Sequence, residues 1–358
     1  MSSILRNYMN KRKITLFEHD KICLDNYYFE AFQSLDERYD NTRIYETDNK
    51  TQRKKINLIN ISDSIFTYFM DGSRKVYKIA DIVTSESKFM PVVAGQVSVG
   101  CCERIHGDMK KFLINRKNYI VLSKAINNED FEYIKQGYER DMKSKLDIIV
   151  EKYDFDRSKT DKPVDSAIEK IQKFMQDLEI EMLTDMVKKD VLDSDNLLIL
   201  DGSLQFLTQK FNPDIFYNVV GVTKSFNPNS TEMTKGKIHI GALLTKLEFA
   251  ERTPVLYSTD KSNRYIYGVW FVRIRKAHKG NPLDGIIKIE KMALKDDKER
   301  DGFETNLIDN ISLSLIAERN PTCHGKDERW ANHLYPVYLT EKMIKSTFLS
   351  DMHFQNLI

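Results

Sequence analysis

Cysteine and histidine are too few and too scattered in this sequence to indicate a disulfide framework or a zinc site. The four cysteines include the adjacent pair Cys101 and Cys102 but no C-x-x-C spacing. Adjacent cysteines are poor disulfide partners, so a reducing, cytoplasmic location is expected. The seven histidines form no H-E-x-x-H motif and no close pair, which disfavours a zinc hydrolase. His324 and His333 flank Trp330; they either line a site or are ordinary surface residues, and the second interpretation is preferred.

Long apolar runs and glycine-rich phosphate loops are also missing. No stretch of 18 apolar residues occurs, and the N-terminus lacks an apolar stretch of signal-peptide length, so neither export nor a membrane span is expected. Neither G-x-x-x-x-G-K-[ST] nor G-x-G-x-x-G after a strand is present, so ATP-driven work would require a partner. Ser73 and Ser203 lie outside any G-x-S-x-G motif, which disfavours a serine hydrolase.

A marked excess of positive charge is absent as well. The chain has 55 Lys and Arg against 53 Asp and Glu, so any surface that binds nucleic acid must be local. Two basic clusters have aromatic neighbours and are candidate DNA contacts: Lys110, Lys111, Arg116 and Lys117 in "MKKFLINRKNY", and Arg273 and Arg275 in "WFVRIRKAHK". Strand alternation puts Arg273 and Arg275 on one face, where they are expected to follow a phosphate backbone. An ordinary solvated surface is the alternative for both clusters.

What is present is the composition of a folded α/β protein, with 358 residues, 41% of them hydrophobic and 30% charged. Residues 1–60 are polar and Tyr-rich, and they are interpreted as an N-terminal helical arm. Residues 61–358 are expected to form the main domain, beginning with about three strands, of which the first ends at Asp71. A helical insertion is expected at about 107–165.

The second half of the sequence alternates between helical and strand-like patterns. A long helix over "AIEKIQKFMQDLEIEMLTDMVKKD" precedes a strand at 197–200, and "LQFLTQKF" is expected to be helical. Strands are expected in "NVVGVTKSF", "YIYGVWFVRIRK" and "GIIKIEKMAL", and further helices in "ALLTKLEFAE" and at about 304–319 and 338–350. This order predicts an α/β fold with a mixed sheet flanked by helices and with helical additions at the C-terminus.

The sequence Asp-Gly-Ser occurs twice after an apolar, strand-like run, at Asp71 and at Asp201. An Asp directly after a buried strand lies at the carboxyl edge of the sheet, where open α/β folds bind ligands. The same three residues also suit an ordinary strand-to-helix turn, because Gly permits the turn and Ser caps a helix. Either Asp alone therefore leaves both interpretations open.

A third carboxylate, Glu179, falls within the apolar stripe of the long helix, between Met175 and Met182. A buried carboxylate is costly unless it is paired or binds a metal, whereas one at the edge of the stripe reaches water. Three acidic groups at one sheet edge repel one another and need a cation, and hard oxygen ligands suit Mg²⁺ or Mn²⁺. Two such ions, about 3.5–4 Å apart, clamp the attacking and leaving oxygens of a phosphodiester. This pattern predicts a metal-dependent nuclease.

Five segments resemble, in order, landmarks of the NurA nuclease family: "FMDGSRKVYKIADIV", "LEIEMLTDMV", "LLILDGSL", "VVGVTKSF" and "HLYPVYLTEKMIK". The resemblance covers residues from about 60 to 350 and implies a fold similar to ribonuclease H. It implies that Asp71, Glu179 and Asp201 are catalytic metal ligands for Mn²⁺ or Mg²⁺. It also implies a homodimer that acts on DNA ends beside a HerA-like hexameric ATPase, in DNA repair or in defence against phage.

The sequence departs from the family pattern after Tyr335-Pro336, where family members place a His or Asp several residues later. Here Glu341 follows, and it either replaces the missing active-site group or is an exposed helix residue. Lys224 resembles a family lysine that would hold the scissile phosphate; a strand-end lysine that reaches solvent is the alternative. The departure leaves a second function open, that of a catalytically silent subunit that clamps DNA or regulates a partner ATPase.

Overall fold

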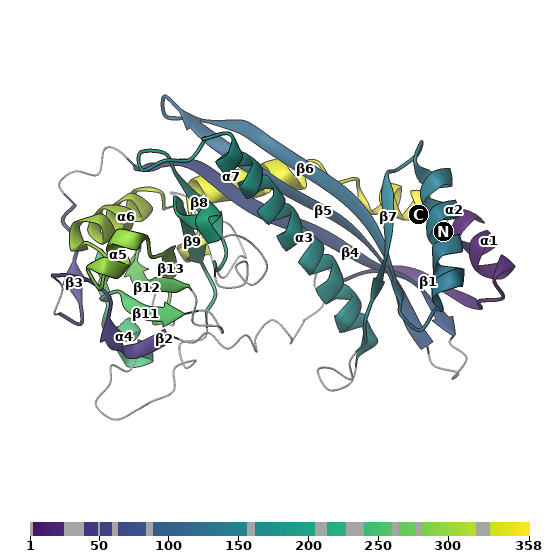
Figure 1. The fold of residues 1–358 in the computed structure, drawn as a ribbon, viewed down its shortest axis with the longest axis horizontal. Helices are drawn as coiled ribbons and strands as arrows, with labels where there is room; N and C mark the ends of the chain where they lie inside the picture. The colour runs from purple at the N-terminus through teal and green to yellow at the C-terminus, as the bar shows by residue number, and fades with distance from the viewer. Residues whose placement is uncertain are drawn as a thin grey trace.

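The chain folds around one large mixed sheet, as a computed structural model shows (Figure 1). The structure describes residues 3–24, 39–48, 51–58, 64–83, 89–155, 162–204, 213–226, 240–259, 265–276, 281–319 and 330–358. Among these residues, no helix is both long enough and apolar enough to cross a membrane.

The strands of the sheet follow the order β2-β11-β12-β13-β9-β8-β4-β5-β6-β7, with β1 paired to β4 and with β10 paired to β12 and β3. Their bounds are β1 Leu16–Cys23, β2 Tyr39–Ile44, β3 Lys54–Lys55, β4 Phe66–Val83, β5 Phe89–Ile105, β6 Asp108–Ser123, β7 Ile148–Tyr153, β8 Leu197–Asp201, β9 Val219–Thr223, β10 Glu251–Arg252, β11 Leu256–Thr259, β12 Ile266–Arg273 and β13 Ile286–Met292. At the centre, β4, β8 and β9 run parallel, whereas β5 and β13 flank them in the antiparallel direction.

Helices pack against the strands of this sheet (Figure 1). They are α1 Ser3–Lys11, α2 Asn128–Met142, α3 Pro163–Lys188, α4 Ile240–Lys246, α5 Lys295–Glu299, α6 Thr305–Ala317, α7 Tyr335–Lys345 and α8 Asp351–Leu357, with short 3-10 helices η2 Pro213–Phe216 and η3 Trp330–Asn332. In Figure 1, α3 lies along the long strands β4, β5 and β6, and α4, α5 and α6 gather around β11 to β13. The predicted mixed sheet flanked by helices is confirmed.

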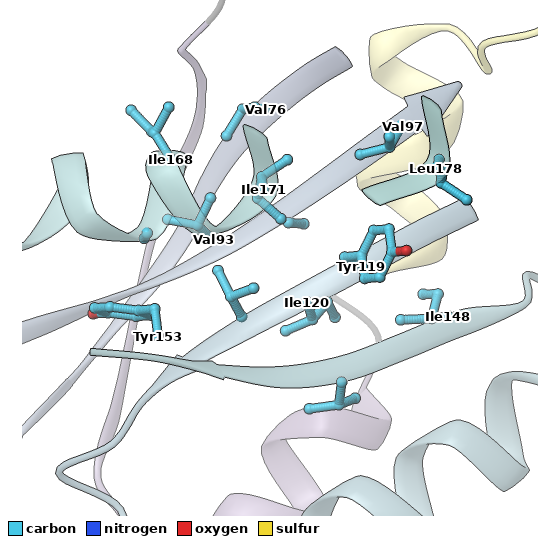
Figure 2. Packing of buried hydrophobic residues seen from close by; sticks show 14 of the residues in the cluster. Val76, Val93, Val97, Tyr119, Ile120, Ile148, Tyr153, Ile168, Ile171 and Leu178 are labelled. Atoms are coloured by element: carbon cyan, nitrogen blue, oxygen red, sulfur yellow. The ribbon is translucent and has the colours of Figure 1, made fainter. Parts of the chain in front are cut away.

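The long helix α3 is held to the sheet by the apolar stripe that its sequence predicts. Ile168, Ile171 and Leu178 are buried and face the side chains of β4 to β7 (Figure 2). A Cβ at Gly95 of β5 would lie 2.9 Å from Ile171, so the glycine permits the close approach of helix and strand. This packing fixes the position of every residue on the inner face of α3.

The first half of the chain contains more strand than the sequence indicated. The described part of residues 1–60 holds α1 and the strands β1, β2 and β3, so it is not a helical arm. The segment 107–165 was expected to be a helical insertion but forms β6, α2 and β7 before α3 begins. The apolar runs "YIVL" and "IIV" pair in parallel between β6 and β7, and this pairing overrides the helical pattern. The predicted helix over "LQFLTQKF" lies almost wholly outside the described residues.

A buried ion pair joins the N-terminal segment to the sheet. The side chains of Arg252 and Glu46 are fully buried, with Arg252 Nη1 3.0 Å from Glu46 Oε2, and Arg252 Nε also donates to Asp309. Arg252→Ala is expected to lower the free energy of unfolding by about 3–5 kcal/mol, because Glu46 remains buried without its partner. Urea unfolding measures this change.

The control for that measurement is Arg12, whose partner Glu129 is 85% exposed. Arg12→Ala is expected to change the stability by less than about 1 kcal/mol. An Arg252 variant as stable as the Arg12 variant would show that the buried pair contributes no net stability.

Candidate active site

Asp71 and Asp201 occupy equivalent positions on two adjacent parallel strands. Met70 of β4 pairs with Leu200 of β8, and an Asp follows in each strand. β8 ends at Asp201, as the sequence predicted, but β4 continues to Val83, paired with β5 except for a register shift between Lys78 and Ala80. The prediction that Asp71 ends a strand is therefore wrong: Asp71 lies within a long strand, beside the end of its neighbour.

The glycine of the first Asp-Gly-Ser makes room for Glu179. A Cβ at Gly72 would overlap Glu179 Oε1 and would lie 3.0 Å from Met175 Cγ. Glu179 is only 7% exposed, so the carboxylate lies on the buried face of α3, as its place in the apolar stripe indicated. The Asp-Gly pair thus supplies one acid and admits a second.

Asp71 and Glu179 approach from opposite faces of β4. Gly100 of β5 pairs with Asp71, so side chains at these two positions lie on the same face of the sheet. A Cβ at Gly100 would lie 2.8 Å from Ile344 of α7, so this face is the one that α7 covers. Because side chains alternate along a strand, Gly72 faces α3 and Glu179 instead. The charge of Asp201 acts on both carboxyls and raises the pKa of each. We call Asp71, Glu179 and Asp201 the acidic site.

The acidic site holds more negative charge than its surroundings neutralise. Burial raises the pKa of Asp71 well above its ordinary value, and the charge of Asp201 raises it further. Burial and Asp201 also raise the pKa of Glu179, to about 8. The carboxylate of Asp71 accepts the N–H of Gly72 at 2.8 Å, which orients the carboxylate without neutralising it. Asp71 and Glu179 therefore favour the protonated form, or a cation that takes the place of the protons.

Lys224 lies within the acidic site and does not reach solvent. It follows β9, and its Nζ is 2.7 Å from Asp201 Oδ2. Burial alone would lower the pKa of Lys224, but the charges of Asp201 and Asp71 outweigh that effect and raise the pKa. The backbone oxygen of Lys224 accepts a hydrogen bond from Asn332, which fixes the end of β9. The lysine is therefore a charged group held beside two carboxylates.

Glu341 lies on α7 at the border of the acidic site. Its side chain is 26% exposed and forms an ion pair with Lys345. Burial raises the pKa of Glu341, but the hydrogen bond from Lys345 and the charges of Lys224 and His333 outweigh burial and lower it. Glu341 is thus a charged, half-buried residue near Lys224, which differs from the fully exposed alternative.

His333 is not the surface histidine that the sequence analysis preferred. It is only 4% exposed, and its charge acts on Glu341. The signal was its position just before Tyr335-Pro336, because the turn at η3 brings this segment against the end of β9. His324 lies outside the described residues.

The donor chemistry of the acidic site suits Mg²⁺ or Mn²⁺, because its three acidic side chains offer hard carboxylate oxygens. Over the described ranges, no group of three or more His, Cys, Asp or Glu residues is arranged to hold a metal ion. The reason is geometric: Asp71 and Glu179 lie on opposite faces of β4, and Asp201 engages Lys224. As the side chains stand in this structure, the three carboxylates are therefore not arranged around a common point.

Arg273 is not a DNA contact, contrary to its prediction from strand alternation. It is 1% exposed, and its guanidinium donates to the backbone oxygens of Leu244, Pro282 and Asp284 at 3.1, 2.6 and 2.6 Å. β12 ends at Arg273, so the arginine closes the neighbouring loop instead of following a phosphate backbone. Arg275 is partly buried, and its guanidinium lies 5.1 Å from the ring centre of Trp330.

The other basic cluster lies on β6, and part of it is committed to contacts within the chain. Arg116 donates to the backbone oxygen of Thr347, and Lys117 forms a 3.1 Å ion pair with Glu181. Lys110 and Lys111 are exposed. These two lysines are the members of the predicted DNA surface that are best placed to meet a ligand.

Comparison with protein-family models and with curated proteins gives no match. Among solved structures, the chain is similar to the NurA nuclease from Sulfolobus solfataricus, with a TM-score of 0.43 and 10% sequence identity. The match covers 100% of this chain and 95% of that one. At this TM-score and identity, the match describes a likeness only, and the chemistry of this chain has to come from its own residues.

Proposed function

We propose that this protein is a divalent-metal-dependent nuclease that hydrolyses phosphodiester bonds in DNA. The observation that carries the proposal is the pair of aspartates on adjacent parallel strands, with a buried glutamate packed against the glycine that follows the first aspartate. Buried carboxyls whose pKa values are raised by burial and by one another are typical of functional sites. A doubly charged cation would relieve the repulsion between these carboxylates and would supply the Lewis acid that phosphodiester hydrolysis needs.

In this proposal, Asp71, Glu179 and Asp201 hold Mg²⁺ or Mn²⁺. Such ions, when bound, activate the attacking water and stabilise the leaving oxygen of the phosphodiester. Asp201 exchanges its ion pair with Lys224 for the cation, which frees Lys224 Nζ to bind the scissile phosphate as a point charge. Glu341 lies beside Lys224 and limits the net positive charge that the phosphate meets.

We further propose that DNA reaches the acidic site along β6 and that a separate ATPase drives it. Lys110 and Lys111 are exposed on β6 and suit contacts to phosphates. A hexameric ATPase of the HerA type, a homodimeric state and a role in DNA repair or phage defence belong to this proposal through the sequence resemblance. The sequence has no phosphate-binding loop of its own, so translocation would depend on the partner.

The direct test uses the purified protein and end-labelled linear DNA with Mn²⁺, with Mg²⁺ or with a chelator. We expect cleavage with either ion and none with the chelator. The assay is repeated with the chain's own partner ATPase, because translocation increases the supply of DNA to the site. An absence of cleavage under all of these conditions would contradict the nuclease proposal.

A second candidate, favoured by the Asp201–Lys224 ion pair, is a catalytically silent subunit that clamps DNA or regulates an ATPase. If Lys224 permanently takes the place of the cation, the site is neutralised without metal. Thermal unfolding with millimolar Mn²⁺ distinguishes the two. A ligand at about 100 times its Kd adds about 2.7 kcal/mol, whereas the silent subunit would show no change in melting temperature.

A further inference from the structure

A buried carboxylate on β13 holds the turn that follows Asp201. Glu290 is fully buried, and its Oε2 accepts hydrogen bonds from Ser203 Oγ at 2.8 Å and from the backbone N–H of Leu204 at 2.7 Å. One oxygen therefore fixes both a side chain and a backbone group within three residues of Asp201. The serine of the second Asp-Gly-Ser bonds to this carboxylate, a role that differs from the helix cap expected of it.

The second oxygen of Glu290 meets a buried cation. Lys288, two residues earlier on β13, is also fully buried, and its Nζ lies 2.8 Å from Glu290 Oε1. Burial of two charges costs several kcal/mol each, and an apolar pair of similar size is often as stable. Stability alone therefore does not explain a charged pair here, at the strand that borders β9.

The turn itself needs an external anchor. Gly202 has φ +147, a conformation that L side chains rarely adopt, so the chain leaves β8 abruptly. The N–H of Gly202 donates to Val222 of β9 at 2.9 Å, and a Cβ at Gly221 would lie 2.9 Å from the oxygen of Gly202. β9 supports one side of the turn, and Glu290 on β13 holds the other through Ser203 and Leu204.

We infer that Glu290 is a positioning residue for the acidic site: it sets the direction of Asp201 by anchoring the Ser203–Leu204 turn, and Lys288 holds its other oxygen. This inference rests on the proposed function, since it assigns Glu290 a role in presenting Asp201 to a cation. Groups that orient metal ligands from outside the coordination shell typically change metal affinity about 10–100-fold when they are removed.

The test compares two double variants that differ only in the acceptor. Lys288→Met with Glu290→Gln removes both charges but keeps an oxygen for Ser203 and Leu204. Lys288→Met with Glu290→Leu removes the charges and the acceptor. Mn²⁺ is titrated into each folded variant and into the wild type, and binding is followed by calorimetry. We expect the Gln variant to bind Mn²⁺ within about threefold of the wild type and the Leu variant to bind at least about tenfold more weakly.

A purely structural role predicts another result: both variants lose stability, but their Mn²⁺ affinities are equal, and this outcome would overturn the inference. If the Leu variant does not fold, Ser203→Ala replaces it, since this change removes one of the two hydrogen bonds and is expected to weaken Mn²⁺ binding severalfold. Wild-type affinity in Ser203→Ala would then count against the inference. A wild-type protein that does not bind Mn²⁺ would instead overturn the proposed metal site, and the role of Glu290 with it.

Discussion

Asp71→Asn and Asp201→Asn are each expected to lower metal-dependent cleavage of linear DNA by at least about 100-fold, which corresponds to about 2.7 kcal/mol of lost transition-state stabilisation. Each substitution keeps the size of the side chain and removes one charged donor from the acidic site. The fold should survive Asp71→Asn, because burial and Asp201 already disfavour the charge of Asp71 in the protein without metal. Asp201→Asn removes the charged partner of Lys224 and is expected to cost some stability, so its fold is checked first. End-labelled DNA with Mn²⁺ measures the activity, and circular dichroism checks the fold.

The matched control for these variants is Glu181→Gln. Glu181 lies on the same helix as Glu179, but it is 53% exposed and pairs with Lys117. This variant is expected to cleave DNA at the wild-type rate. Full activity in Asp71→Asn or in Asp201→Asn would remove that aspartate from the proposed mechanism, whatever the control shows.

Glu179→Gln is expected to change how the stability of the metal-free protein depends on pH. The pKa of Glu179 rises from its ordinary 4.5 to about 8 in the folded protein. Between these pH values the unfolded chain has released a proton that the folded chain retains, so stability falls as pH rises through this window. With a factor of about 1.4 kcal/mol per pK unit, the loss is on the order of 3–5 kcal/mol by pH 8. The Gln variant lacks this loss and should be more stable than the wild type at pH 8.

Urea unfolding at pH 5 and pH 8, with chelator present, measures that difference. Mn²⁺ should reverse it for the wild type, because the metal binds the deprotonated carboxylate, and should stabilise the wild type more at pH 8 than at pH 5. A wild-type protein whose metal-free stability matches the Gln variant at both pH values would show that Glu179 is not a buried, proton-holding group. That result would remove Glu179 from the acidic site.

The parts of the fold that the sequence predicted are those set by local periodicity. The apolar stripe of α3 placed Glu179 on the buried face, and the run before Asp201 marked the end of β8. Asp71 was misplaced because the apolar pattern stops there, whereas the pairing with β5 continues for twelve more residues, to Val83. That pairing, like the burial of Arg273 by three backbone oxygens, is a long-range contact that no local pattern records.

Long-range contacts also explain why the sequence did not predict the roles of Glu290 and His333 near the acidic site. Glu290 lies 87 residues from Ser203 in the chain, and nothing in the sequence around either residue joins them. The charge of His333 acts on Glu341 because η3 lies at the end of β9, where Asn332 bonds to Lys224, and α7 packs on β4 and β5. Sequence motifs predicted the residues of the acidic site itself. The residues that support them could be identified only once the topology of the sheet was known.

The two aspartates of the acidic site differ in how firmly the sheet holds them, because β4 continues past Asp71 whereas β8 ends at Asp201. The residues before and after Asp71 pair with β5, so the backbone of Asp71 is held in place when a ligand binds. In contrast, β8 ends at Asp201, and the chain turns at the next residue, Gly202. Any adjustment that admits an ion must therefore be made by the second aspartate, within the limits set by the anchored turn that follows it.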